Sequence, residues 1–199
     1  MTVPQSYLIV GGSSDIALIL AESLLDEGHA VTLLARDAAR CQALQDRGAE
    51  LVQGDALDTE LVQQAVQIAK DRGDGSIAGV AHLVGSLLIR PPHAVKLDAF
   101  NDVIHTNLSS AFLTLSTACK TMLRSGGGRL VFTSSVAASL GLVNHEAIAA
   151  AKGGIESMVR TAASTYSQRG PRSTRKIERV LMSAGNGDFL LSCFPIARR

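Results

Sequence analysis

The segment YLIVGGSSDIALILAESLLDE, residues 7–27, decides the fold class of this chain of 199 residues. A short apolar run, two glycines and then apolar residues at helical spacing predict a buried strand, a tight turn and a helix. Gly11 and Gly12 lack a Cβ, so a phosphate could approach their backbone, and the free amides at the helix start would attract it. The turn is therefore a candidate nucleotide site. The alternative is a structural turn in which Ser14 or Asp15 caps the helix.

Strands and helices are expected to alternate along the chain as far as Gly170. Apolar runs predict the strands, and apolar residues at helical spacing, bounded by glycines and capping residues, predict the helices. After the first helix, the expected strands are 30–35, 50–53, 77–84 and 129–133, and the expected helices are 37–46, 58–71, 97–124 and 145–168. This alternation predicts a three-layered, Rossmann-like doubly wound α/β fold. Its parallel sheet would be covered by helices on both faces, with ligands at the carboxyl ends of the strands.

The composition favours a soluble globular protein. With 46% hydrophobic residues and a net charge of +1, the chain has no basic run that would indicate a nucleic-acid partner. It has neither an apolar run of membrane-spanning length nor a signal-peptide pattern at its start, so we expect a cytoplasmic protein without membrane contact. Its three cysteines are far apart, which favours reduced thiols over disulfides or a metal site.

The chain changes character after Pro171. Residues 171–199 carry six basic and two acidic side chains, and their apolar pattern is weak. Runs at 177–183 and 188–193 predict either a hairpin that turns at Asn186 and Gly187 or a poorly ordered tail.

The polar residues at the ends of the expected strands occur in an order that resembles the short-chain dehydrogenase/reductase family, over about residues 6–170. The family's first turn has a Thr and three glycines, and the matching residues here are Val10, Gly11, Asp15 and Ala17. The resemblance implies a NAD(P)-binding Rossmann domain at 1–170, followed by an atypical tail at 171–199. It also implies that the dinucleotide lies along the first turn, at Gly11, Ser13, Ser14, Asp15 and Ile16. Asp15 would be unfavourable beside a pyrophosphate unless its side chain points aside or caps its own helix.

The adenosine end of the cofactor is expected at two further loops. Asp55 and Ala56 match the family's contact with the adenine ring, although an aspartate is also common in such a loop. Ala35 stands where NAD-preferring members carry an acid, and Arg36 stands where NADP-preferring members carry a base. We therefore favour NADP(H) over NAD(H), because an arginine can pair with the 2′-phosphate. An ordinary surface arginine is the alternative.

The family's Asn-Asn-Ala-Gly segment corresponds here to His82, Leu83, Val84 and Gly85. The resemblance places Leu83, Val84 and Gly85 beside the cofactor. His82 is interpreted as a satisfied, partly buried histidine rather than a catalyst.

The family's catalytic residues are only partly kept. Ser135 and Lys152 have the family spacing, but the position of the catalytic Tyr is Ile148, which has no proton to give. The resemblance implies that Ser135 orients the substrate oxygen, that Lys152 binds the nicotinamide ribose, and that Asn107 holds a water and a backbone kink. His145, three residues before Ile148, or a bound water could supply the proton. Residues 144–146 could also merely begin the helix.

Three functions remain open at this stage. The first is an oxidoreductase that transfers a hydride between NADP(H) and a carbonyl or secondary alcohol of a small-molecule substrate. The second is a catalytically impaired dinucleotide-binding module. The third is a remnant, because the family's sixth strand, substrate-covering segment and seventh strand have no matching pattern and the tail looks truncated or frame-shifted. Such a tail would leave strand 129–133 at the sheet edge. Family members commonly dimerise, which implies a homodimer through helices 97–124 and 145–168.

Overall fold

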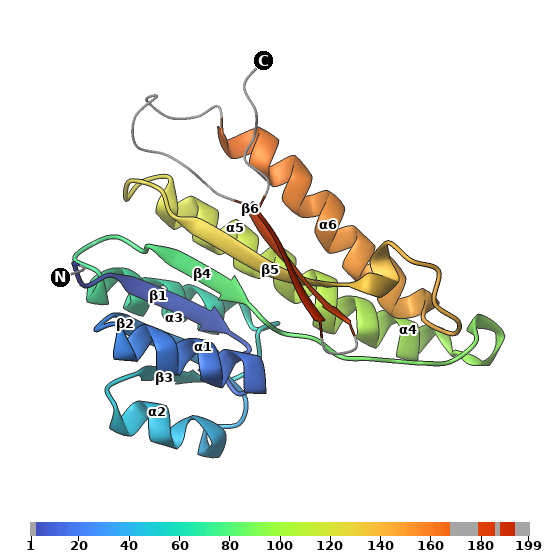
Figure 1. Ribbon diagram of the computed structural model, residues 1–199, viewed down its shortest axis with the longest axis horizontal. Helices are drawn as coiled ribbons and strands as arrows, with labels where there is room; N and C mark the ends of the chain where they lie inside the picture. The colour runs from blue at the N-terminus through green and yellow to red at the C-terminus, as the bar shows by residue number, and fades with distance from the viewer. Residues whose placement is uncertain (1–2, 168–178, 186–187, 194–199) are drawn as a thin grey trace.

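The structure is a computed structural model that describes residues 3–167, 179–185 and 188–193, the last two segments by their backbone alone (Figure 1). The strands described form one sheet in the order β3-β2-β1-β4-β5-β6-β7. They are β1 (Ser6–Val10), β2 (Ala30–Ala35), β3 (Glu50–Gln53), β4 (Gly79–His82), β5 (Arg129–Ser135), β6 (Arg179–Gly185) and β7 (Asp188–Cys193). All neighbouring pairs from β3 to β6 are parallel, and β7 pairs antiparallel with β6. The predicted Rossmann-like α/β fold is therefore confirmed.

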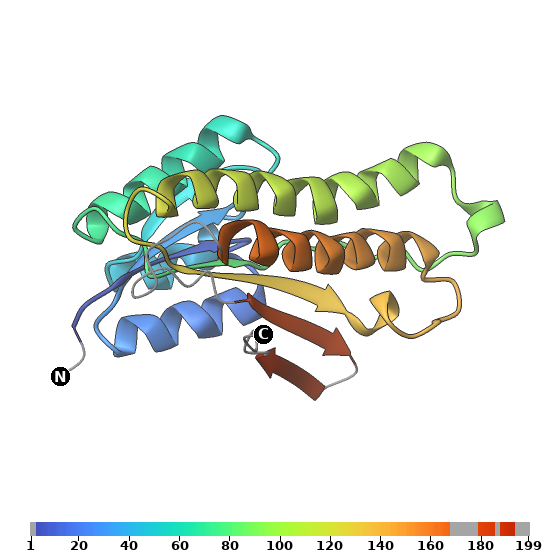
Figure 2. The same ribbon diagram turned by 90° about the horizontal axis from the view of Figure 1, so that it is seen from above.

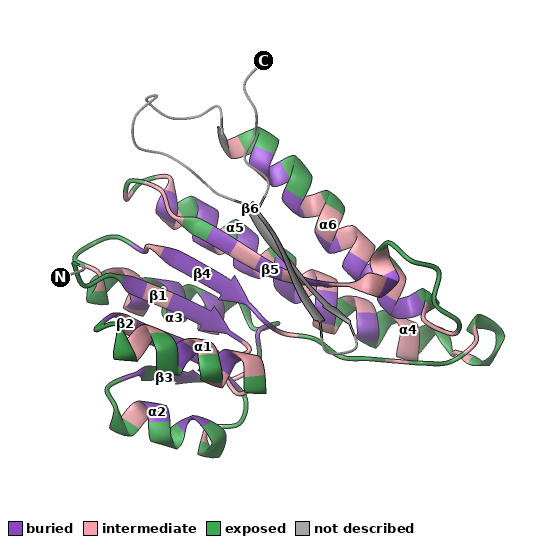
Figure 3. Ribbon diagram, in the orientation of Figure 1, coloured by how far each residue is buried: buried purple, intermediate pink, exposed green. Residues whose placement is uncertain are grey.

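Helices cover both faces of this sheet, as Figure 2 shows. They are α1 (Asp15–Asp26), α2 (Gln42–Asp46), α3 (Thr59–Arg72), α4 (Leu97–Ile104), α5 (Ser110–Met122) and α6 (Glu146–Ser167). Successive residues of β1 enter different cores, because side chains alternate between the faces of a strand. Leu8 and Val10 pack in the core formed with α3, α5 and α6, whereas Ile9 packs in the core formed with α1 and α2. Figure 3 shows the buried residues along the central strands and the inward faces of the helices.

The helix expected over 97–124 is interrupted. A π-helical segment, His105–Ser109, separates α4 from α5, so the prediction of one continuous helix is wrong. The helix expected over 37–46 likewise becomes a 3₁₀ turn, Ala39–Cys41, followed by the short α2. Both departures lie beside the carboxyl ends of the strands.

The prediction that β5 forms a sheet edge is also wrong. β6 pairs parallel with β5, from Leu130 opposite Arg179 to Ser135 opposite Ala184. The crossover that a parallel pair requires contains α6, which follows β5 in the chain. β6 and β7 pair antiparallel from Gly185 opposite Asp188, while the turn expected at 186–187 lies outside the described residues. The domain boundary expected at 170 also lies outside them.

Candidate functional site

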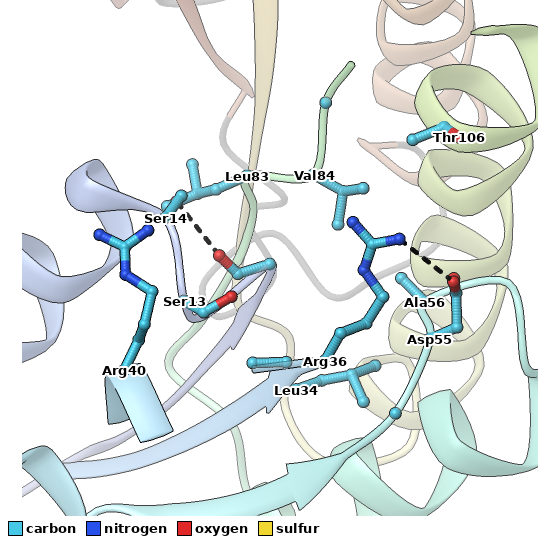
Figure 4. A pocket seen from close by; sticks show the side chains of 14 residues that line it. Ser13, Ser14, Leu34, Arg36, Arg40, Asp55, Ala56, Leu83, Val84 and Thr106 are labelled. Atoms are coloured by element: carbon cyan, nitrogen blue, oxygen red, sulfur yellow. Dashed lines mark hydrogen bonds and ion pairs between the residues drawn. The ribbon is translucent and has the colours of Figure 1, made fainter. Parts of the chain in front are cut away.

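A cavity of about 230 Å³ opens at the carboxyl ends of β1, β2 and β4 (Figure 4). It is lined by Gly11, Ser13, Ser14, Leu34, Ala35, Arg36, Arg40, Gly54, Asp55, Ala56, Leu83, Val84, Gly85 and Thr106. Most of the residues expected at the cofactor are therefore brought together here, although they come from four separate loops. Asp15, Ile16 and Lys152, which were also expected there, are not part of this lining.

The first turn is packed tightly against its neighbours. Gly11 has a φ of +86°, and a Cβ there would lie 2.8 Å from the amide nitrogen of Val84. A Cβ on Gly12 would lie 3.0 Å from the Cβ of Leu33. Glycine is thus needed at position 11 for backbone conformation and close approach to the end of β4. The side of each glycine on which a Cβ would stand is occupied by protein atoms, whereas Gly11 also lines the cavity.

The amides of the turn divide into two groups. Gly11 and Gly12 donate to the carbonyl of Leu34, Ser14 donates to the carbonyl of Gly11, and the amide of Ala17 donates to Ser14 Oγ. Among the described residues, the amides of Ser13, Asp15 and Ile16 donate to no protein acceptor. Unpaired amides in the first turn of a helix suit an anion. These three amides therefore offer the turn's free donors to an anion.

Ser14 is the residue that caps α1, and Asp15 takes a different partner. Ser14 Oγ also donates to the carbonyl of Gly11, at 3.1 Å. The Asp15 carboxylate accepts a hydrogen bond from the Arg40 guanidinium. Asp15 thus points aside, as was required for a phosphate to approach, but it does so through an ion pair rather than a cap.

Arg36 and Asp55 lie next to each other in the lining of the cavity, as Figure 4 shows. Arg36 NH1 lies 3.8 Å from Asp55 Oδ2, and both side chains are exposed. Asp55 Oδ1 accepts a hydrogen bond of 2.9 Å from the amide of Leu57, as aspartates in loops commonly do. Asp55 therefore shapes its own loop and also holds Arg36 at the cavity.

Lys152 and Asn107 both approach Gly85 in the loop that leaves β4. A Cβ on Gly85 would be 3.4 Å from Asn107 Oδ1 and 3.6 Å from Lys152 Nζ. Lys152 Nζ donates to the carbonyls of Thr133, at 3.2 Å, and Val84, at 3.5 Å. Burial lowers the pKa of Lys152 to about 8. The cation is thus held where β4 and β5 end, next to the cavity.

A model of a protein family matches most of this chain. Residues 5–175 match the model described as short chain dehydrogenase. The chain belongs to the short-chain dehydrogenase/reductase family. Members of this family bind nicotinamide dinucleotides, which agrees with the position of the cavity.

Individual relatives of this short-chain dehydrogenase/reductase are distant. 2-(S)-Hydroxypropyl-CoM dehydrogenase 3 of Xanthobacter autotrophicus is 29% identical over 188 residues, which cover 92% of this chain and 74% of that protein. The 3-oxoacyl-[acyl-carrier-protein] reductase MabA of Mycobacterium tuberculosis is 28% identical over 166 residues, which cover 83% of this chain and 65% of the reductase. A solved short-chain type dehydrogenase/reductase from Mycobacterium ulcerans has a TM-score of 0.79 at 24% identity, covering 90% of this chain and 67% of that one. The chain spans about two thirds to three quarters of the length of these proteins.

The remaining predicted catalytic residues lie at the start and end of one loop. Ser135 ends β5, two residues after the carbonyl that Lys152 contacts, and its Oγ accepts a hydrogen bond from the amide of Ala137. His145 precedes α6, and its Nδ1 lies 2.7 Å from the carbonyl of Val143. These contacts place Lys152 near the end of β5, whereas no hydrogen bond in the described part of the chain joins His145 to Ser135 or Lys152.

Ile148, which the resemblance matches to the family's catalytic Tyr, is part of an apolar cluster. It is 3% exposed and packs with Val103, Ala137 and Ala151. The side chain at this position is therefore part of the core.

The sequence interpretation missed Arg40 and Thr106 as residues of the cavity. Arg40 reaches the cavity from the 3₁₀ turn Ala39–Cys41, where a regular helix was expected. Thr106 adjoins Asn107 and reaches the cavity through the π-helical segment, which lies where the resemblance implied a backbone kink.

Membrane-spanning helices and clustered metal ligands are both absent from the described residues. None of the described helices has the length and apolar character needed to cross a membrane. In the same residues, no three side chains of the metal-binding types lie together.

Proposed function

We propose that this chain transfers a hydride between NADP(H) and a carbonyl or secondary alcohol of a small molecule. The observation that carries the proposal is the convergence of three features on one cavity. These are the unpaired amides at the start of α1, the Arg36 side chain, and the Gly85 loop beside Lys152. An anion-binding helix start next to a cation at the strand ends is the arrangement that a dinucleotide requires.

Each part of the cavity would hold one part of the cofactor. The amides of Ser13, Asp15 and Ile16 would bind the pyrophosphate. Asp55 and Ala56 would contact the adenine, and Arg36 would pair with the 2′-phosphate. Lys152 would bind the nicotinamide ribose, next to Gly85. The bound dinucleotide would supply or accept the hydride, and the chain's own residues would orient it.

The substrate oxygen would be oriented by Ser135 at the end of β5. Because Ile148 has no exchangeable proton, the proton must come from another group. His145 is bonded to the carbonyl of Val143 and to no group at the strand ends within the described residues, so we favour a water beside Ser135. Losing a positioned general acid costs roughly 10²- to 10⁴-fold in rate, so we expect slow turnover.

The alternative is a dinucleotide-binding module without turnover. It is favoured by one observation, the burial of Ile148 among Val103, Ala137 and Ala151 where the family has its phenol. In this case the cavity would still bind NADP(H), and the protein would act through the bound state rather than through chemistry.

The test is a fluorescence titration of the purified chain with NADPH and NADH, followed by turnover assays on a panel of ketones and alcohols. We expect tighter binding of NADPH and a slow rate that Ser135→Ala reduces further. Ser139→Ala, on the exposed loop that follows, is the matched control and should leave the rate unchanged. Binding without any turnover would favour the alternative.

Absence of binding to either nucleotide would overturn both proposals. The remnant hypothesis is tested with the same sample, by thermal unfolding with and without NADPH. We expect a single cooperative transition that NADPH raises, because a ligand that binds only the folded state stabilises it.

We also propose that the chain forms a homodimer through α4, α5 and α6. An apolar groove between α5 and α6 is lined by Leu108, Ser109, Phe112, Leu113, Gly154 and Met158. Phe112 is 57% exposed at this groove. Burial of so large an apolar side chain by a second copy would favour association.

A further inference from the structure

A buried histidine at the end of β4 has no part in the proposed chemistry. His82 is fully buried, and both of its ring nitrogens have a partner on α5. Nδ1 lies 3.0 Å from Thr114 Oγ1, and Nε2 lies 3.2 Å from Ser110 Oγ. The ring also lies beside that of Phe132, with centroids 5.7 Å apart. His82 is therefore fixed in position between the sheet and α5.

The partners of His82 stand at the end of the π-helical segment. In an α-helix the amide of Ser110 would donate to the carbonyl of Thr106. Here that amide donates to the carbonyl of His105, one residue further back, as a π-turn requires. The Ser110 hydroxyl donates to the Thr106 carbonyl instead, at 2.5 Å. A side chain thus replaces the backbone hydrogen bond that the wide turn removes.

The short hydrogen bond between Ser110 Oγ and the Thr106 carbonyl favours one tautomer of His82. Burial, and the nearby charge of Lys152, lower the pKa of His82 to about 3, so the ring is neutral and carries one N–H. Ser110 Oγ uses its proton on Thr106, and it can then bond to the ring only by accepting from Nε2–H. Nδ1 then accepts from the hydroxyl of Thr114. That hydroxyl also lies 3.0 Å from the Ser110 carbonyl, a longer contact than the 2.5 Å between Ser110 Oγ and the Thr106 carbonyl, so we assign the Thr114 proton to Nδ1. With this tautomer His82, Ser110 and Thr114 each have a hydrogen-bond partner.

The wide turn that this cluster supports carries two residues of the site. Thr106 lines the cofactor cavity, and Asn107 is fully buried next to it. Asn107 Nδ2 donates to the carbonyl of Val103 at 2.9 Å and to Ser86 Oγ at 3.0 Å. Its Oδ1 accepts from the amide of Ser86 at 3.2 Å. The turn therefore fixes the loop that follows β4, which passes between the cavity and Lys152.

We propose that His82 is a positioning residue, whose Nε2–H holds Ser110 on the Thr106 carbonyl and thereby keeps the wide turn that aims Thr106 and Asn107 at the cofactor loop. The structural part of this proposal stands on the hydrogen bonds of the cluster alone. Its consequence for dinucleotide affinity rests on the function proposed above.

The test compares variants of His82 that can replace the hydrogen bond of only one ring nitrogen. Glutamine can place an amide N–H near the position of Nε2, whereas asparagine can replace only Nδ1. We expect His82→Gln to keep the hydrogen exchange of amides 105–110 and the affinity for NADPH within about threefold of wild type. We expect His82→Asn and Ser110→Ala to speed exchange in that segment and to weaken NADPH binding about tenfold, because each removes the Nε2 to Ser110 bond.

Ser6→Ala is the matched control for the loss of a buried serine hydrogen bond. Ser6 Oγ donates to the carbonyl of Ala69 at 2.6 Å, at the amino end of β1 and far from the π-turn. We expect this variant to lose stability but to keep both wild-type exchange in 105–110 and wild-type affinity. Ser110→Ala keeps the imidazole, so it tests the proposal even if changes at position 82 impair folding.

The outcomes are distinct for the two proposals. Equal exchange rates at 105–110 in His82→Gln and His82→Asn would overturn the positioning role, because a residue that only fills space has no preference between its nitrogens. Wild-type exchange in Ser110→Ala would overturn it as well. The exchange measurement needs no nucleotide, so a chain that fails to bind NADPH refutes the proposed function and still decides the role of His82.

Discussion

The Nζ atom of Lys152 lies 3.2 Å from the carbonyl oxygen of Thr133, two residues before Ser135 at the end of β5. A second carbonyl, that of Val84 in the loop after β4, lies 3.5 Å away. Both partners are neutral, and burial lowers the pKa of this lysine to about 8. The folded chain therefore keeps a lysine where its charge is costly, at the point where a dinucleotide would meet the substrate.

Replacing Lys152 by methionine should stabilise the chain near neutral pH. Below pH 8 the folded protein buries a charged ammonium, whereas methionine has a similar length and no charge. We expect Lys152→Met to raise the free energy of unfolding at pH 7 by about 1 to 3 kcal/mol, the range that a pKa lowered from 10.5 to about 8 implies after loss of the two hydrogen bonds. NADPH binding and turnover should both decrease.

The pH dependence of this difference has a defined sign. Between pH 8 and about 10.5 the unfolded state binds more protons at this lysine than the folded state does. The free energy of unfolding of the wild type therefore rises with pH relative to that of the variant. Urea unfolding of both proteins from pH 7 to pH 10 measures the change. Lys120→Met, at an exposed position of α5, is the control and should show no such trend. A constant difference over this range would contradict the buried, destabilised ammonium.

Arg36→Ser should change the choice of cofactor. Arg36 lines the cavity with its side chain 76% exposed, and its nearest acidic partner, Asp55, is 3.8 Å away. Such an exposed pair is weak, so the guanidinium can leave it for a phosphate. We expect the variant to bind NADPH about 10- to 100-fold more weakly and NADH within about twofold of wild type. The salt dependence of NADPH binding should fall as well.

The control for this substitution is Arg47→Ser. Arg47 is another exposed arginine with an acidic partner, Asp26, but it lies at the opposite end of α1 from the cavity. It should leave the affinities for both nucleotides unchanged. If Arg36→Ser weakened the binding of NADH and of NADPH equally, Arg36 would not bind the 2′-phosphate.

The sequence was sufficient for the layered fold and for most of the cavity because those features depend on local patterns. An apolar strand, a glycine turn and a capped helix at 6–26 are encoded within one segment, and so are Arg36 after β2 and Asp55 after β3. The parallel sheet then brings the ends of these strands to one edge. Family resemblance supplied Lys152 and Ser135, which spacing alone would not have assigned.

The sequence was insufficient where the decisive contacts join distant segments. The resemblance implied a kink at Asn107, but the contacts around the π-turn come from His82, 28 residues before Ser110, and from Ser86, 21 residues before Asn107. No local periodicity reports such contacts. The pairing of β6 with β5 was not expected because the apolar pattern of residues 171–199 is weak. The crossover between these two parallel strands contains α6.

Phe112→Glu should dissociate the proposed homodimer. Phe112 is 57% exposed on α5, at the apolar groove that also includes Leu108 and Met158. A buried glutamate without a partner would oppose association strongly, because its charge would lose water. We expect sedimentation velocity to show a monomer for this variant and a dimer for wild type. Ile19→Glu, at a 65% exposed position of α1, is the control and should remain dimeric. A wild-type monomer at micromolar concentration would refute this assembly.

Asp15→Asn should strengthen the binding of NADPH. In the folded chain the Asp15 carboxylate is bonded to Arg40, which lines the cavity, and it adds a negative charge beside the amides that would receive the pyrophosphate. Asparagine removes that charge and frees Arg40 for a phosphate. We expect the affinity for NADPH to rise about 3- to 10-fold, at a cost of about 0.3 to 1 kcal/mol in stability, because a carboxylate in the first turn favours the helix. Asp26→Asn breaks the similar pair with Arg47 at the other end of α1 and should not change the affinity. An unchanged or weaker affinity in Asp15→Asn would mean that the pair between Asp15 and Arg40 organises the site rather than competing with its ligand.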